Sequence, residues 1–170
     1  PTRSFGVPNC LLLKKGKARS GGLGRIGYAL MYSMMNLQHN KILHHIDEND
    51  YDRLSYPVHR VWAAREWIDA HPSIFKGYWE NAHLVSFDKE DFFASVYLRP
   101  GEKLLLGVVN WQPEDRAVRA TLHPDTLGLE AGAMAIEDAI TGDPVAATGS
   151  AIALDVPGDG YRLLKIWRQP

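Results

Sequence analysis

Apolar and polar residues recur with two different periods along this chain. In the first half, apolar residues at three- and four-residue spacing predict a helix that ends at Asn40 and a second helix over residues 57–70. Short apolar runs at residues 11–13 and 41–46 predict buried strands. The predicted order in this half is therefore strand, helix, strand, helix.

After about residue 82 the apolar period shortens to two residues, which is typical of strands. Polar or Pro-Gly segments at residues 88–91, 99–102 and 158–160 separate the runs and predict tight turns. Short strands at this spacing indicate an antiparallel sandwich or barrel. The predicted strands cover residues 82–87, 92–98, 103–110, 116–122, 133–138, 144–147, 151–156 and 161–167.

The two halves together predict a mixed α+β fold class. Residues 1–80 are expected to form the last β/α units of an incomplete (β/α)8 barrel, and residues 81–170 an all-β antiparallel sandwich. Parallel strands need cover on both faces, which the first half is too small to supply. The chain also does not begin with Met. We therefore expect a fragment whose partner is a missing N-terminal barrel portion.

Composition narrows the possible partners. The chain has 170 residues with 45% hydrophobic and 23% charged residues, as in a folded globular protein. Its net charge of -1 gives no general attraction to nucleic acid or to an anionic membrane, and no apolar run reaches the length of a membrane span. The single cysteine, Cys10, excludes an internal disulfide and a cysteine-based zinc site. The cellular compartment is not predicted.

Three stretches in the second half carry a resemblance to a known group of enzymes. They are Leu-Leu-Leu-Gly-Val-Val-Asn-Trp at 104–111, Asp-Ala-Ile-Thr-Gly-Asp at 138–143 and Gly-Tyr-Arg-Leu-Leu-Lys-Ile at 160–166. In this order they resemble the C-terminal β-sandwich of glycoside hydrolases with a (β/α)8 barrel, such as the α-amylase and α-galactosidase types. Residues 75–79 fall where such proteins pass from barrel to sandwich. The resemblance implies a structural, accessory sandwich and a fragment that is inactive alone.

The resembling stretches also have local physical roles. Asn110 is expected to adopt a strained turn conformation and to bond back to the main chain. Asp138 is expected to accept hydrogen bonds from the N–H groups of the turn that follows it. Thr141-Gly142 is expected to supply the positive φ of a tight hairpin. None of these roles is catalytic.

The candidate active site follows from the barrel interpretation. Residues 41–46 would be a late barrel strand, and binding groups in such barrels lie at the C-terminal ends of strands. This places His44, His45, Asp47 and Glu48 near the mouth as substrate-binding candidates, with Asp47 as the candidate catalytic carboxylate. The alternative is a solvated loop that caps the next helix. Adjacent residues of a strand point to opposite faces, so the two histidines do not suggest a shared metal ion.

Two tryptophans are candidates for stacking on the carbohydrate substrate. Trp79 and Trp111 both lie at segment ends, where an indole ring can meet the apolar face of a sugar. The alternative for each is ordinary packing, and for Trp79 a plug at the join between the two units. If the sandwich itself binds sugar, the chain is a non-catalytic carbohydrate-binding or structural module.

A dinucleotide-binding protein is the remaining alternative. Residues 22–27 read Gly-Leu-Gly-Arg-Ile-Gly, and Asp47 follows twenty positions after the last glycine. However, no strand runs into the first glycine, and no third strand-helix unit follows. We therefore predict no cofactor.

Overall fold

A computed structural model describes residues 60–61, 63–130, 132–158 and 160–169 of the chain. The predicted strands at residues 11–13 and 41–46, the helix that ends at Asn40 and the glycine-rich residues 22–27 lie outside the described residues.

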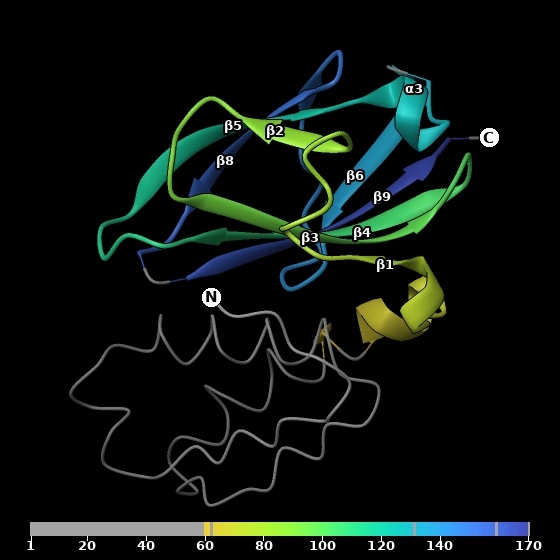
Figure 1. The fold of residues 1–170 in the computed structure, drawn as a ribbon, viewed down its shortest axis with the longest axis horizontal. Helices are drawn as coiled ribbons and strands as arrows, with labels where there is room; N and C mark the ends of the chain where they lie inside the picture. Colours follow the sequence, from red (N-terminus) through yellow and green to blue (C-terminus); the bar gives the residue numbers. More distant parts are fainter. Residues whose placement is uncertain (1–59, 62, 131, 159, 170) are drawn as a thin grey trace, which may run out of the picture.

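The described chain folds into two antiparallel sheets that face each other, as Figure 1 shows. One sheet has five strands in the order β1-β3-β4-β9-β6, and the other has four in the order β2-β5-β8-β7. The strands are β1 (Phe75–Lys76), β2 (Val85–Phe87), β3 (Phe92–Arg99), β4 (Lys103–Asn110), β5 (Arg116–Leu122), β6 (Met134–Asp138), β7 (Ala147–Thr148), β8 (Ala151–Val156) and β9 (Tyr161–Arg168). A 3-10 turn, η1 (Pro72–Ile74), and a short helix, α3 (Pro124–Leu127), connect them.

The main core lies between the two sheets. Alternate residues of each strand point inward, because side chains in a strand face opposite sides in turn. The most deeply buried inward side chains of β4, β5, β8 and β9 are at most 1% exposed and include Leu104, Leu106, Val108, Leu122, Ile152, Leu164 and Ile166. Leu127 of α3 closes one end of this core.

The five-stranded sheet is covered on its outer face as well. Residues 60–61 and 63–68 are helical, and this leading helix places Val61, Ala64 and Ile68 against Leu105 and Leu163 of the sheet. In Figure 1 the helix lies beyond the five-stranded sheet, on the side away from the four-stranded one. Burial on both faces explains why β3 and β4 are nearly continuous apolar runs.

Among the described residues, the four-stranded sheet is covered on one face only. Along β5 and β8 buried and exposed residues alternate, so Val118 and Leu154 point into the core while Arg119 and Asp155 face outward. An antiparallel sheet with one solvated face produces this alternation.

Most predicted strands are confirmed by the structure. The predictions for β4, β5 and β8 agree with the observed bounds at both ends. The strand predicted at residues 144–147 is only partly present, because Pro144 forms an isolated bridge with Glu137 and β7 begins at Ala147. The two-residue strand β1 was not predicted.

The predicted fold class, a mixed α+β chain with a partial (β/α) barrel segment before the sandwich, is wrong. Every strand pair among the described residues is antiparallel, and the helices there are few and short. The leading helix has the predicted helical spacing but covers an antiparallel sheet instead of connecting parallel strands. Helical periodicity identifies a buried face without identifying what covers it, which is the physical reason for the error. No TIM barrel is evident in this part of the chain. The predicted division near residue 80 stays a prediction.

The hairpin predicted at Asp138 is confirmed in detail. Oδ1 of Asp138 accepts hydrogen bonds from the main-chain N–H groups of Ile140, at 2.8 Å, and Thr141, at 3.1 Å. Gly142 has a φ of 83° and donates its N–H to the Asp138 main-chain oxygen at 2.8 Å. Asp138 is 5% exposed, so the hydrogen bonds of its carboxylate organise the turn in a dry environment.

Asn110 also bonds to the main chain as predicted. Its Nδ2 donates to the main-chain oxygens of Glu114 at 2.8 Å, Val156 at 3.2 Å and Pro157 at 3.3 Å. Its own backbone is the last residue of β4, and the positive φ at this end of the sheet, 66°, belongs to Asp91. The strained conformation predicted for Asn110 is therefore found at a neighbouring residue.

Candidate functional site

The sequence-predicted site residues fall into two groups. His44, His45, Asp47 and Glu48 lie outside the described residues, and their roles in substrate binding or catalysis stay predictions. Trp79 and Trp111 are described.

Trp79 and Trp111 belong to one row of aromatic side chains along the five-stranded sheet, which we call the aromatic row. Each ring contacts the next at a centroid distance between 5.1 and 6.4 Å, in the order Trp111, Phe93, Tyr78, Trp79, Phe75, Tyr97. Most of these contacts are edge-on, the geometry that aromatic quadrupoles favour. The two tryptophans are thus linked through two intermediate rings.

The two tryptophans differ in the surface that they offer. Trp111 is 41% exposed, whereas Trp79 is half-buried. The Trp79 ring lies directly against Gly77, because a Cβ added at that glycine would be 2.4 Å from the ring atoms. Glu80 fixes the same turn by accepting the Gly77 N–H at 3.1 Å. Trp79 is therefore a packed side chain, and Trp111 is the more accessible end of the row.

Sequence reasoning considered Tyr78 together with Trp79 but missed two other rings of the row, Phe93 and Tyr97. Phe93 and Tyr97 lie four residues apart in β3, and their inward-facing neighbours Phe92 and Val96 belong to the main core. The period-two pattern therefore places both on the outer face, and this signal was available in the sequence.

Two tyrosines on this sheet, the buried Tyr97 and the half-buried Tyr161, have raised pKa values. Burial, with a smaller contribution from the nearby Asp138 carboxylate, raises the pKa of Tyr161 to about 12. Burial also raises the pKa of Tyr97, although the Arg65 guanidinium opposes this shift. Both phenols stay neutral at physiological pH and are packing groups with a polar end.

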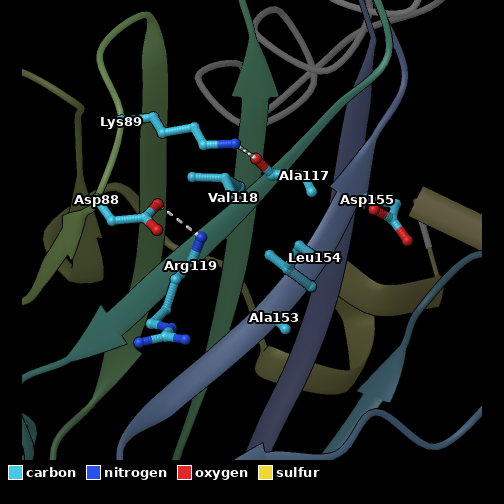
Figure 2. A pocket seen from close by; sticks show the side chains of 8 residues that line it. All are labelled: Asp88, Lys89, Ala117, Val118, Arg119, Ala153, Leu154 and Asp155. Carbon is cyan, nitrogen blue, oxygen red and sulfur yellow. Dashed lines mark hydrogen bonds between the residues drawn. The ribbon is translucent and has the colours of Figure 1, made fainter.

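A second surface feature lies on the outer face of the four-stranded sheet. It is a hollow of about 240 Å³. Figure 2 shows the residues that line it: Asp88, Lys89, Ala117, Val118, Arg119, Ala153, Leu154 and Asp155. Lys89 reaches across one end and donates to the Ala117 main-chain oxygen at 2.5 Å. Asp88 accepts the main-chain N–H of Arg119 at 2.8 Å. Sequence reasoning did not single out these residues, although outward alanines in β5 and β8 are a visible signal.

Metal binding and membrane insertion have no structural candidate in this part of the chain. The described residues contain no group of three or more His, Cys, Asp or Glu side chains close enough to hold a metal ion. None of the helices among them has the length and apolar character of a membrane span.

Comparison with known families identifies the sandwich. Residues 57–143, just over half of the chain, match the family described as glycoside hydrolase 123, C-terminal domain. The chain belongs to this family. The resemblance to glycoside-hydrolase C-terminal sandwiches that the sequence suggested is thereby confirmed, and the chain is a glycoside-hydrolase-related domain. Comparison with curated proteins found no match.

Solved structures show the same fold in larger enzymes. Alpha-galactosidase I from Mortierella vinacea matches with a TM-score of 0.55 and 16% identity over 88% of this chain and 37% of its own. An alpha-amylase from Anoxybacillus matches with a TM-score of 0.52 and 9% identity over 87% of this chain and 33% of its own. This glycoside hydrolase 123 C-terminal domain thus spans about a third of each of these proteins, and at such low identity the likeness concerns the fold alone.

Proposed function

We propose that this chain is the structural, accessory sandwich of a glycoside hydrolase and does not hydrolyse glycosides alone. Its partner would be a catalytic portion that precedes the sandwich and binds the carbohydrate substrate. The family match supports the link to glycoside hydrolases. The observation that carries the structural role is the attachment of the leading helix to the five-stranded sheet.

Polar contacts hold the C-terminal end of the leading helix to the sheet. Lys103 Nζ donates to the main-chain oxygen of Trp67 at 2.6 Å, and Arg99 Nε donates to that of Ile68 at 2.8 Å. The Arg99 guanidinium also binds the main-chain oxygen and the carboxylate of Asp69, at 2.9 and 2.6 Å. The last carbonyls of a helix lack helical partners and carry partial negative charge, so cations stabilise them.

Apolar packing reinforces these contacts. Val61, Ala64 and Ile68 are fully buried in a cluster with Tyr97 and Leu105 of the sheet. Burying a side chain such as Ile68 contributes about 2 kcal/mol. A flexible linker would show neither buried side chains nor satisfied helix-end carbonyls, so a rigid connection to the preceding polypeptide suits a domain that positions and stabilises its neighbour.

Two carboxylates of the sandwich, Asp138 and Asp88, make hydrogen bonds that favour a structural role over catalysis. Glycoside hydrolysis ordinarily uses two carboxylates on either side of the scissile bond. The buried carboxylate of Asp138 already accepts two turn N–H groups and lies 3.3 Å from the Arg162 guanidinium. Asp88 is likewise occupied by the Arg119 N–H. These acceptors organise turns.

Two measurements test the proposal. The purified chain is expected to show no turnover above the buffer rate on a panel of 4-nitrophenyl glycosides. In native-state hydrogen exchange, Arg99→Ala with Lys103→Met is expected to speed exchange of the helix amides at residues 64–68 by at least tenfold, whereas Arg119→Ala on the opposite sheet leaves them unchanged. Turnover that Asp47→Asn abolishes, or helix amides that exchange at unprotected rates in the unmodified chain, would contradict the proposal.

A second candidate function is carbohydrate binding by the exposed end of the aromatic row. The exposure of Trp111 and its edge contact with Phe93 at 6.1 Å favour it, because a supported indole ring is a platform for the apolar face of a sugar. Titration with oligosaccharides, followed by tryptophan fluorescence, tests it. Binding that Trp111→Ala removes and Trp167→Phe retains would support this candidate, and an unchanged titration in Trp111→Ala would eliminate it.

A further inference from the structure

The hollow on the four-stranded sheet has a floor of small side chains. Ala117 of β5 and Ala153 of β8 both face outward and are exposed. Exposed sheet faces usually carry β-branched or long polar side chains, which fit the pleat better than alanine. Alanine at positions 117 and 153 therefore has a lower strand propensity than these residues, and its small side chain leaves an open depression with an apolar floor.

Longer polar side chains form the rim of this depression. Lys89 and Arg119 contribute two positive charges, and Asp88 and Asp155 contribute two negative ones, so the rim has no net charge. Within the described residues, neither the Arg119 guanidinium nor the Asp155 carboxylate has a hydrogen-bond partner in the structure. Figure 2 shows Arg119 and Asp155 at different parts of the rim. The site thus offers free donors and free acceptors around an apolar floor.

We propose that this hollow binds one uncharged pyranose unit of a carbohydrate chain. The apolar face of the sugar ring lies on Ala117 and Ala153, and its hydroxyls bond to Arg119 and Asp155. The balanced charge of the rim favours a neutral polyhydroxylated ligand over an anion or a cation. The volume of about 240 Å³ suits a single ring. The inference goes beyond the proposed structural role and involves the sheet opposite to the leading helix.

The test uses the whole chain and two-dimensional amide NMR. Uncharged methyl glycosides of glucose, galactose and N-acetylgalactosamine are titrated to tens of millimolar, with glucuronate and glucosamine as charged counterparts. We expect saturable shifts of the amides of Ala117, Arg119 and Ala153 with at least one uncharged glycoside. We expect the charged counterparts to bind at least roughly tenfold more weakly, since each leaves an unbalanced charge in the site.

Variants assign the binding to the hollow. Ala153→Gln fills the floor and Arg119→Ala removes the principal donor, and each is expected to weaken binding at least roughly tenfold. Ala151→Gln is the matched control, because it places the same side chain on the same strand and face without lining the hollow. Thermal unfolding verifies that all three variants fold.

Several outcomes would overturn the inference. They are the absence of saturable shifts with every uncharged glycoside, a preference for a charged counterpart, unchanged binding in Ala153→Gln, and shifts confined to residues near Trp111. The assay is independent of the hydrolysis and helix-exchange measurements, so failure here leaves the proposed accessory role intact, and the reverse also holds.

Discussion

Lys103 contacts Trp67 in two ways: its Nζ donates a hydrogen bond of 2.6 Å to the main-chain oxygen of Trp67 and lies 5.0 Å from the centroid of the Trp67 ring. Lys103 of β4 thus binds both the main-chain carbonyl and the indole ring of Trp67, at the end of the leading helix. Trp67 in turn packs edge-on against Trp167 of β9 at 6.1 Å. This pair ties the leading helix to the centre of the five-stranded sheet.

Replacing this lysine tests the importance of the contact. Lys103→Met retains most of the aliphatic stem and removes the ammonium, so it loses the bond to the helix end and the cation–π contact. We expect the free energy of unfolding to fall by about 2 kcal/mol, measured by urea denaturation. The control is Lys89→Met, which also loses a bond to a carbonyl but at an exposed strand, where we expect a loss under about 1 kcal/mol. Equal losses in the two variants would refute the special role of Lys103.

Asp69 ends the leading helix in an unusual conformation for a non-glycine residue. Its φ is 52°, its N–H donates to the Glu66 oxygen at 3.0 Å, and the Ala70 N–H donates to the Arg65 oxygen at 2.9 Å. This is the Schellman arrangement, in which glycine is the usual residue at the left-handed position.

Two substitutions at Asp69 separate backbone strain from charge. Asp69→Gly and Asp69→Ala both lose the exposed contact with Arg99, which contributes little to stability. Only alanine is strained at this φ, so we expect Asp69→Ala to be less stable than Asp69→Gly by about 1 kcal/mol in chemical denaturation. The opposite order of stabilities would show that the helix end changes conformation.

The buried side chain of Asn110 both donates and accepts hydrogen bonds, and its replacement by aspartate, which has nearly the same shape, tests how much the donated bonds contribute to stability. In Asn110→Asp the carboxylate faces the main-chain oxygens of Glu114, Val156 and Pro157, which lose their shared donor. We expect the free energy of unfolding at neutral pH to fall by about 3 kcal/mol or more. Because protonation removes the buried charge, we also expect part of this loss to be recovered in mild acid. A loss under about 1 kcal/mol would mean that water reaches these carbonyls.

The raised pKa of Tyr161 makes stability depend on alkaline pH. Its pKa is about 12 in the folded protein and close to 10.0 in the unfolded chain, so the fold favours the neutral phenol. This contribution is fully present below pH 10 and is lost as pH rises toward 12. We expect the free energy of unfolding of Tyr161→Phe to fall less between pH 10 and 12 than that of the unmodified chain. In an ultraviolet titration, the variant should lack one tyrosine that ionises near pH 12. Titration of Tyr161 near pH 10 in the native protein would contradict its burial.

The sequence alone determined the strands of the sandwich and several of its turns. Strands β4, β5 and β8 were predicted with their observed bounds. Buried and exposed residues alternate along β5 and β8, β4 is a nearly continuous apolar run, and turn residues end each of them. The roles of Asp138 and Gly142 were also predicted, since a hairpin's positive φ and its unpaired N–H groups depend on neighbouring residues. These are local relationships.

Only the tertiary structure decided what covers the apolar face of the leading helix and the faces of the two sheets. Helical spacing at Val61, Ala64 and Ile68 revealed an apolar side without revealing that it packs on an antiparallel sheet, and the predicted barrel segment followed from that ambiguity. The aromatic row and the hollow likewise join residues far apart in the chain, such as Tyr78 with Phe93 and Asp88 with Arg119. Such contacts depend on strand order and register, which bring distant segments together in ways that local periodicity does not encode.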